Sequence, residues 1–150
     1  MLKKYVKNQR GLTLIELLAV IVILGIIAAI AIPSIGGIIE NSKTKAHKAN
    51  ALMILDAARL YDVDKNQGGG NFTIATDASD NNLKPDQALV ANGYLDAIPK
   101  DPTQSSANYG YIVVQKNAGV FTVTLGSNST TLYVDHRTKE QINNDNLKTN

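Results

Sequence analysis

The sequence predicts an α+β fold in which one long amino-terminal helix packs on a small antiparallel sheet of about three to four strands. Residues 12–32 are apolar except for Thr13 and Glu16, which indicates a long apolar helix. Residues 35–60 then repeat apolar side chains at steps of three and four, as one helical face requires. Short alternating segments separated by turn residues follow between residues 109 and 137, and this pattern is typical of β-hairpins.

The chain opens with a basic leader over residues 1–11 and an apolar helix half over residues 12–33. A helix over residues 12–32 is about 31 Å long, close to the hydrocarbon thickness of a bilayer. The run is longer than the apolar core of a secretory signal peptide, and no clear A-x-A cleavage site follows it. We therefore expect a membrane anchor with a cytoplasmic amino terminus. The leader charges are Lys3, Lys4, Lys7 and Arg10.

Glu16 is the unexpected residue of this anchor, because a carboxylate inside a membrane helix costs about 2.5–3.5 kcal/mol unless it is paired. Leu12 lies one helical turn before it. If the chain were cut between Gly11 and Leu12, the new α-amine would bring a positive charge into the same apolar layer. Glu16 of the same chain or of a neighbouring chain could then pair with that amine. Glycine suits the cut, since it opposes helix formation there and carries no side chain.

The motif G-L-T-L-I-E-L over residues 11–17, after a short basic leader, resembles the class III signal of type IV pilins and pseudopilins. The resemblance implies that a prepilin peptidase cuts after Gly11 and that the same enzyme N-methylates Leu12. It also implies that Leu12, Thr13 and Glu16 direct assembly. Leucine after the cut is a departure, since phenylalanine is commoner there.

The type IV pilin fold that the resemblance implies has a long kinked helix packed on a small sheet. Proline removes a backbone hydrogen bond and clashes with the preceding turn, so we expect a kink near Pro33, which matches the family's proline. In assembled filaments of the family the helix loses its regular winding between the positions of Gly25 and Pro33. The sequence permits the same melting here.

Residues 34–66 are predicted to be the amphipathic half of the helix, which ends near Lys65 before the glycines at 68–70. We expect one stripe of this half to be buried against the sheet. The stripe consists of Ile35, Ile39, Ser42, Ala46, Ala49, Met53, Ala57 and Leu60.

Residues 67–108 are predicted to be a connecting loop with a short strand at 72–75 and a two-turn helix at 85–93. Residues 89–102 resemble the loop before the sheet in Gram-positive pilins and major pseudopilins. The sheet region, 109–137, should hold strands at 109–115, 120–125 and 131–135, with four-residue links at 116–119 and 126–129. The polar tail, 138–150, is expected to be mobile.

The composition disfavours several functional classes. The sequence has no cysteine. Of its 15 lysines and arginines, four lie in the leader, so the rest of the chain has 11 basic and 13 acidic residues and is slightly acidic. That balance argues against nucleic-acid binding. Asp62, Asp64 and Asn66 begin like a calcium loop, but the sixth and twelfth positions do not match, so we interpret them as a polar helix end. His47 and His136 are predicted to lie on the surface. We expect no catalytic group, metal or cofactor, and no enzyme activity.

These features predict a type IV pilin precursor that forms an extracellular homopolymeric pilus, with roles in cell adhesion and motility. Its partners would be the membrane, the peptidase and methyltransferase, and the pilus assembly machinery. One alternative is a pseudopilin of a type II secretion or competence DNA-uptake system. Nucleic acid would be a partner only in the DNA-uptake system. Another alternative is an anchored binding domain that never polymerises. Lack of cysteine favours a Gram-positive source, because many Gram-negative pilins close a loop by a disulfide.

Overall fold

The computed structural model describes residues 13–65, 69–76, 84–104 and 107–144. The chain divides into two compact units, Met1–Ile39 and Glu40–Asn150. Helix α1 (Leu14–Lys65) begins in the first unit and ends in the second. Its carboxyl end is at the predicted residue, whereas Leu12, the predicted first residue, lies outside the described residues.

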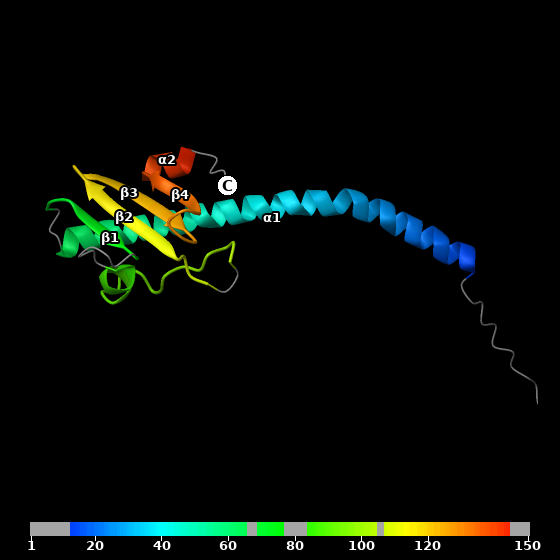
Figure 1. Ribbon diagram of the computed structural model, residues 1–150, viewed down its shortest axis with the longest axis horizontal. Helices are drawn as coiled ribbons and strands as arrows, with labels where there is room; N and C mark the ends of the chain where they lie inside the picture. Colours follow the sequence, from blue (N-terminus) through cyan, green and yellow to red (C-terminus); the bar gives the residue numbers. More distant parts are fainter. Residues whose placement is uncertain (1–12, 66–68, 77–83, 105–106, 145–150) are drawn as a thin grey trace, which may run out of the picture. The chain divides into compact units, whose positions relative to one another are not determined.

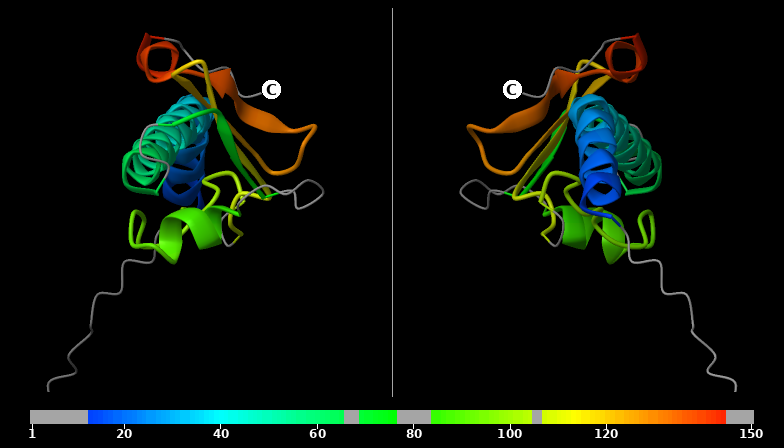
Figure 2. Two further views of the ribbon diagram at one scale, coloured as in Figure 1. Left: turned by 90° about the vertical axis from the view of Figure 1, so that its left-hand side faces the viewer. Right: turned by 90° about the vertical axis from the view of Figure 1, so that its right-hand side faces the viewer.

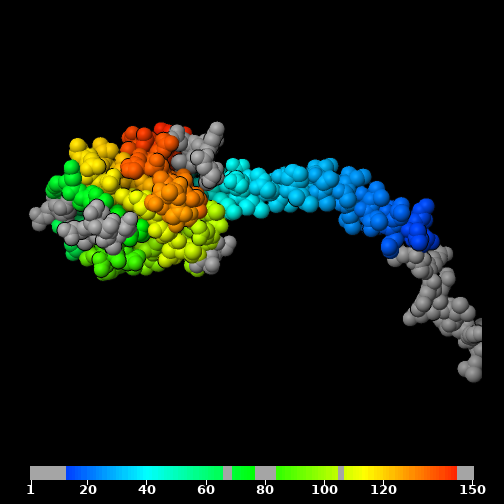
Figure 3. Space-filling model, viewed as in Figure 1, coloured from blue at the N-terminus to red at the C-terminus, as the bar shows by residue number. Residues whose placement is uncertain are grey.

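In the first unit, α1 is a bare apolar helix. Its large apolar side chains are between 49% (Val20) and 84% (Leu14) exposed, and Figure 3 shows them as the surface of the helix in that view. By length and composition α1 can cross a membrane, and it is the one such helix in the described parts of the chain. The helix continues through Gly25 and Pro33 without interruption, so melting between them on assembly stays a prediction.

The second unit contains a four-stranded antiparallel sheet in the order β1-β2-β3-β4. Its strands are β1 (Phe72–Ala75), β2 (Tyr111–Asn117), β3 (Val120–Gly126) and β4 (Leu132–Arg137). They lie side by side in sequence order, as Figure 1 shows, because each connection returns the chain to the neighbouring position. The predicted fold class is therefore confirmed, and each predicted strand has a counterpart.

The turn between β2 and β3 is shorter than predicted. Tyr111 pairs with Gly126 at one end of the ladder and Asn117 pairs with Val120 at the other, which leaves a two-residue turn. Its residues Ala118 and Gly119 have φ angles of 49° and 81°. Two successive positive φ angles are typical of the type I′ turn, whose twist matches that of the strands. The predicted four-residue link was wrong because Lys116 and Asn117 continue the strand.

In the second unit, α1 packs along one face of the sheet (Figure 2). The predicted buried stripe is wrong: of its residues only Ala57 is buried, and Met53 and Leu60 are 43% and 59% exposed. Both sides of this helix half carry small apolar residues, so periodicity alone does not choose between them. The face that packs on the sheet includes two polar side chains. It consists of His47, Ala51, Ile54, Leu55, Ala57, Ala58 and Asp62.

The loop before the sheet adds a short helical segment to the core. Residues Asp86–Val90 form a π-helical turn, η1, in place of the predicted two-turn helix. The Ala91 N–H bonds the Asp86 carbonyl at 2.8 Å, five residues back, which is the π pattern. Leu89 in this turn is fully buried. The turn ends at Val90, before the predicted Gly93, whose φ of 77° lets the chain change direction three residues later.

The predicted mobile tail forms a short helix over its described part. Helix α2 (Lys139–Asn144) follows β4 directly, and its Ile142 is fully buried in the core. A reciprocal capping box starts it: the Thr138 N–H donates to Gln141 Oε1 at 2.9 Å, and the Gln141 N–H donates to Thr138 Oγ1 at 3.3 Å. One apolar residue with a cap is enough to dock an otherwise polar segment. Residues 145–150 lie outside the described residues.

Replacing Ile142 with alanine is expected to lower the free energy of unfolding of the second unit by about 2–5 kcal/mol, because the deletion leaves a cavity in a fully buried position. Chemical denaturation of the mature chain in neutral detergent micelles measures the change. The control is Asn143→Ala, which alters the exposed neighbour on the same helix. Equal stability of both variants would mean that the tail does not contribute to the core.

Candidate assembly site

The described part of α1 starts with a hydrogen-bonded pair formed by Thr13 and Glu16. Glu16 Oε2 accepts from the Thr13 N–H at 2.8 Å and from the Thr13 hydroxyl at 2.9 Å. The Glu16 N–H in turn approaches Thr13 Oγ1 at 3.4 Å, and Leu17 makes the first helical bond, to the Thr13 carbonyl at 3.1 Å. This is the capping box, in which side chains occupy backbone groups that a helix end leaves unpaired.

The capping box gives Glu16 a role that the sequence interpretation missed, although the signal T-x-x-E before an apolar run is readable in residues 13–16. Both of its side-chain bonds end on Oε2, and Oε1 accepts no hydrogen bond from the described residues. The carboxylate therefore caps its own helix and still has one oxygen for a partner. Gly11, Leu12 and the leader charges lie outside the described residues.

A buried ion pair ties the end of α1 to the sheet. Lys116 Nζ on β2 lies 2.8 Å from Asp62 Oδ2, and both side chains are less than 10% exposed. The same ammonium donates to the Gly69 carbonyl at 2.9 Å. Asp62, the first residue of the calcium-like pattern, thus bonds a lysine, while Asp64 bonds Tyr94. No group of three or more His, Cys, Asp or Glu that could hold a metal occurs among the described residues.

The prediction of surface histidines is wrong for His47, which is fully buried. Its ring stacks on Tyr133 of β4 at a centroid distance of 4.0 Å, and its two ring nitrogens meet hydroxyl groups of Tyr109 and Thr103. All three partners lie more than 50 residues away in sequence, so no local pattern reveals them. His136 is exposed, as predicted, and pairs with Asp135.

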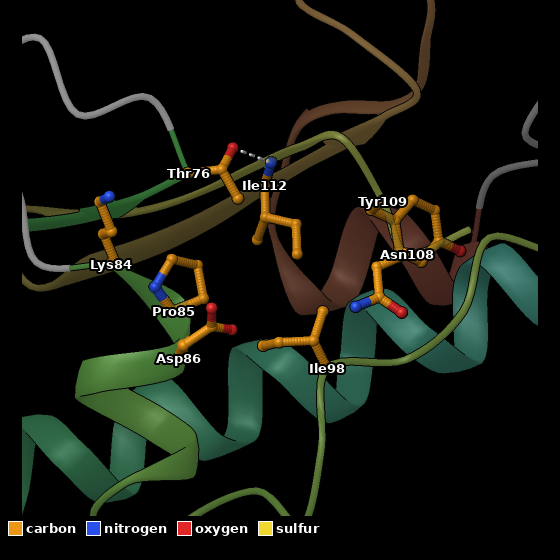
Figure 4. A pocket seen from close by; sticks show the side chains of 8 residues that line it. All are labelled: Thr76, Lys84, Pro85, Asp86, Ile98, Asn108, Tyr109 and Ile112. Carbon is orange, nitrogen blue, oxygen red and sulfur yellow. Dashed lines mark hydrogen bonds between the residues drawn. The ribbon is translucent and has the colours of Figure 1, made fainter.

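A hollow of about 230 Å³ lies beside η1 and β2 (Figure 4). Its Thr76 hydroxyl is already used, since Oγ1 accepts from the Ile112 N–H at 3.0 Å and donates to the Gly110 carbonyl at 3.3 Å. The described lining combines apolar side chains with one lysine and one aspartate, and it includes no histidine or serine nucleophile. The lining residues are Thr76, Lys84, Pro85, Asp86, Ile98, Asn108, Tyr109 and Ile112.

Comparison with known proteins agrees with this arrangement. The model of the prokaryotic N-terminal methylation motif matches residues 6–32. The type II secretion system core protein G of Escherichia coli K12 is 31% identical over 105 residues, which cover 63% of this chain and 67% of that protein. The Pseudomonas aeruginosa core protein G is 30% identical over 108 residues, covering 69% and 74%. The Vibrio cholerae core protein G is 27% identical over 128 residues, covering 83% and 84%.

The chain spans 62% of the length of the Pectobacterium carotovorum core protein G, to which it is 29% identical. No solved structure matches the chain significantly.

A methylation motif, a bare apolar helix and a four-stranded sheet packed on the helix end define a type IV pilin-like protein. Proteins of this class are structural subunits, and the chain is not an enzyme. The chain belongs to the family of type II secretion system core protein G.

Proposed function

We propose that this chain is the precursor of a pseudopilin, the polymerising subunit of a type II secretion system. The observation that carries the proposal is its similarity to core protein G of several bacteria, which extends beyond the methylation motif into the second unit. This similarity favours the pseudopilin alternative over the extracellular pilus that the sequence first indicated. The precursor inserts into the membrane with its leader on the cytoplasmic side and is cut between Gly11 and Leu12.

The bare surface of α1 explains how such a subunit polymerises. Its large apolar side chains before residue 40 are at least 49% exposed, and in the membrane they face lipid. In a polymer they pack against the same helix of other copies, which keeps them out of water as they leave the bilayer. Glu16 needs a positive partner in that apolar core. The α-amine of Leu12 in a neighbouring copy supplies the charge once the leader is removed.

The outward face of α1 in the second unit offers a further packing surface between copies. Met53 and Leu60 on this face are exposed, although the sequence pattern predicted them to be buried. Ala49 is exposed on the same side, one turn before Met53. Apolar side chains in such a row are typical of surfaces that become covered on association.

Deleting the gene in its native host tests the function. If the chain is a pseudopilin, the deletion abolishes release of proteins across the outer envelope, and a plasmid copy restores it. Loss of long surface fibres with normal protein release would instead identify the pilus. Normal protein release and normal fibres would contradict the secretion pseudopilin and the pilus, and would favour the DNA-uptake pseudopilin if uptake of DNA is lost or the anchored domain if it is not.

Intact mass spectrometry of the membrane-extracted protein is expected to give the mass of residues 12–150 plus one methyl group. The physical reason is that the peptidase must free the α-amine of Leu12 before that amine can pair with Glu16. In Gly11→Val a β-branched side chain obstructs the peptidase at the cleavage site, so this variant should retain the full precursor mass. Retention of residues 1–11 in the unaltered protein would contradict the proposed processing.

A further inference from the structure

His47 joins three parts of the second unit that lie far apart in sequence. From α1 its ring packs on Tyr133 of β4, and its nitrogens reach Tyr109 Oη at 2.8 Å and Thr103 Oγ1 at 3.0 Å. Thr103 belongs to the segment of residues 98–104, here named the DP loop after its Asp-Pro pair. The ring therefore holds this loop to α1 together with Asn50 of the same helix, whose Nδ2 donates to the Lys100 carbonyl at 3.3 Å.

Neighbouring hydrogen bonds favour one protonation state of the ring. The Tyr109 hydroxyl oxygen already accepts from Asn50 Nδ2 at 3.1 Å, so its own O–H is available to donate to His47 Nδ1. An accepting Nδ1 places the proton of the neutral ring on Nε2, which then donates to Thr103 Oγ1. A second proton on Nδ1 would turn this acceptor into a donor and leave the Tyr109 O–H without its acceptor.

Asp101 in the DP loop is an incompletely paired acid beside this ring. It is 1% exposed, and its Oδ1 accepts from the Thr103 N–H at 2.8 Å. Its Oδ2 is buried and accepts no hydrogen bond from the described part of the chain. A buried carboxylate oxygen without a donor is unfavourable, so it is available to any positive charge or donor that arises next to it.

We propose that His47 is an acid-sensitive latch whose protonation releases the DP loop from α1. The added proton turns Nδ1 from an acceptor of the Tyr109 O–H into a donor and places a positive charge in a buried position, and both effects disfavour the closed contact. The Asp101 carboxylate, which belongs to the DP loop itself, opposes the release. The latch itself is a property of the single subunit. Its use, to make the stability of subunits respond to the pH outside the inner membrane, rests on the proposed function.

The charges around the ring set the direction of the effect. Burial lowers the pKa of His47, the nearby Asp101 carboxylate opposes that shift, and Lys43 on α1 adds to it. Tyr109, whose own pKa is raised by burial, stays neutral beside the ring, and Tyr133 stacks on it. When the DP loop is closed on α1, His47 is therefore neutral. When the loop is open, that is, released from α1, His47 takes up a proton near its ordinary pKa of about 6.5. Closure is fully favoured above that pH and weakens as the pH falls below it.

Hydrogen exchange on the unassembled mature subunit in neutral detergent micelles tests the latch. The readout is the protection factor of the Asp101, Thr103 and Gln104 amides, each hydrogen-bonded in the closed loop. Between pH 7.5 and 5.5 these factors are expected to fall by up to about tenfold, as one proton taken up by the open state requires. The amides of Val114 and Val123, paired at the centre of the sheet, serve as the reference.

Substitutions assign the effect to His47. His47→Gln should remove the pH dependence, while His136→Gln, at the other histidine of the chain, should leave it unchanged. Asp101→Asn should lower the pKa of His47 in the closed loop, and Lys43→Gln should raise it, since the two charges act on the ring in opposite directions. The pH at which the fall in protection is half complete should therefore be lower in Asp101→Asn and higher in Lys43→Gln. If His47→Gln does not fold, the Lys43 and Asp101 shifts decide.

Protection factors of the loop amides that do not change between pH 7.5 and 5.5 in the unaltered protein would overturn the latch. The same fall in these factors in His47→Gln would overturn it as well. Because the subunit is not assembled in this experiment, a failure here leaves the secretion proposal standing. Conversely, a host without a secretion defect would leave the latch standing.

Discussion

Replacing Glu16 with glutamine is expected to reduce polymer formation by the mature subunit about a hundredfold or more. In the proposed polymer the α-amine of Leu12 pairs with Glu16 in apolar surroundings, and the substitution leaves that amine without a counter-charge. Removing one member of a buried ion pair costs about 3–5 kcal/mol, and about 3 kcal/mol corresponds to a hundredfold change in an equilibrium constant. The amount of subunit in sheared, sedimentable polymers relative to the membrane pool measures the effect.

Thr13→Ala is the matched control, because the structure shows that Glu16 also caps its own helix. The variant removes the hydroxyl that bonds Glu16 and keeps the carboxylate, so it should lose only the cap, worth about 1 kcal/mol. A small defect in Thr13→Ala beside a large one in Glu16→Gln assigns the effect to charge. Equal losses of polymer in both variants would mean that Glu16 acts only by capping its own helix.

Replacing Asp62 with alanine is expected to lower the free energy of unfolding of the second unit by about 3–5 kcal/mol. The change leaves the Lys116 ammonium, less than 10% exposed, without its carboxylate partner at 2.8 Å. That amount is a large fraction of the stability of a typical domain, which is about 5–15 kcal/mol. Denaturation of the mature chain in micelles, followed by circular dichroism, measures the loss.

Asp56→Ala provides the control on the same helix. Asp56 pairs with Lys139 at 2.9 Å, but both side chains are more than 40% exposed, so this pair should contribute only about 0–1 kcal/mol. The double variant Asp62→Asn with Lys116→Met, which removes both charges together, should recover most of the stability lost in Asp62→Ala. Similar losses in Asp62→Ala and Asp56→Ala would show that burial does not strengthen the Asp62–Lys116 pair.

The elements of the fold were predictable because their signals are local. The helix ends at Lys65, before the glycines, and β1 covers the predicted residues 72–75. The strands of the meander are displaced by no more than two residues at either end. Alternation and turn residues determine these positions, and both are properties of a few neighbouring residues.

The buried face of α1 was not predictable from local signals. His47 and Asp62 are polar, so the pattern places them outside, yet each is buried by a partner more than 50 residues away. A hydrogen-bonded histidine and a paired aspartate satisfy the rule that buried polar groups need partners. The partners themselves become visible only when the sheet has placed Tyr109 and Lys116 beside the helix.

Two features of the chain were predictable and were missed. Residues 13–16 and 138–141 both carry the capping-box pattern, T-x-x-E and T-x-x-Q, and in the structure both make the reciprocal bonds. The second box, with Ile142 next to it, indicates a short docked helix where a mobile tail was expected. The first explains part of the role of Glu16 and leaves the assembly role as a proposal.

The most direct measurement is a cryo-electron microscopy map of the assembled polymer in which the side chain of Glu16 is resolved. We expect its carboxylate within about 4 Å of the Leu12 α-amine of a neighbouring copy, the range of a salt bridge. A map in which Glu16 contacts only Thr13 of its own chain, with the neighbouring amine elsewhere, would contradict the proposed assembly.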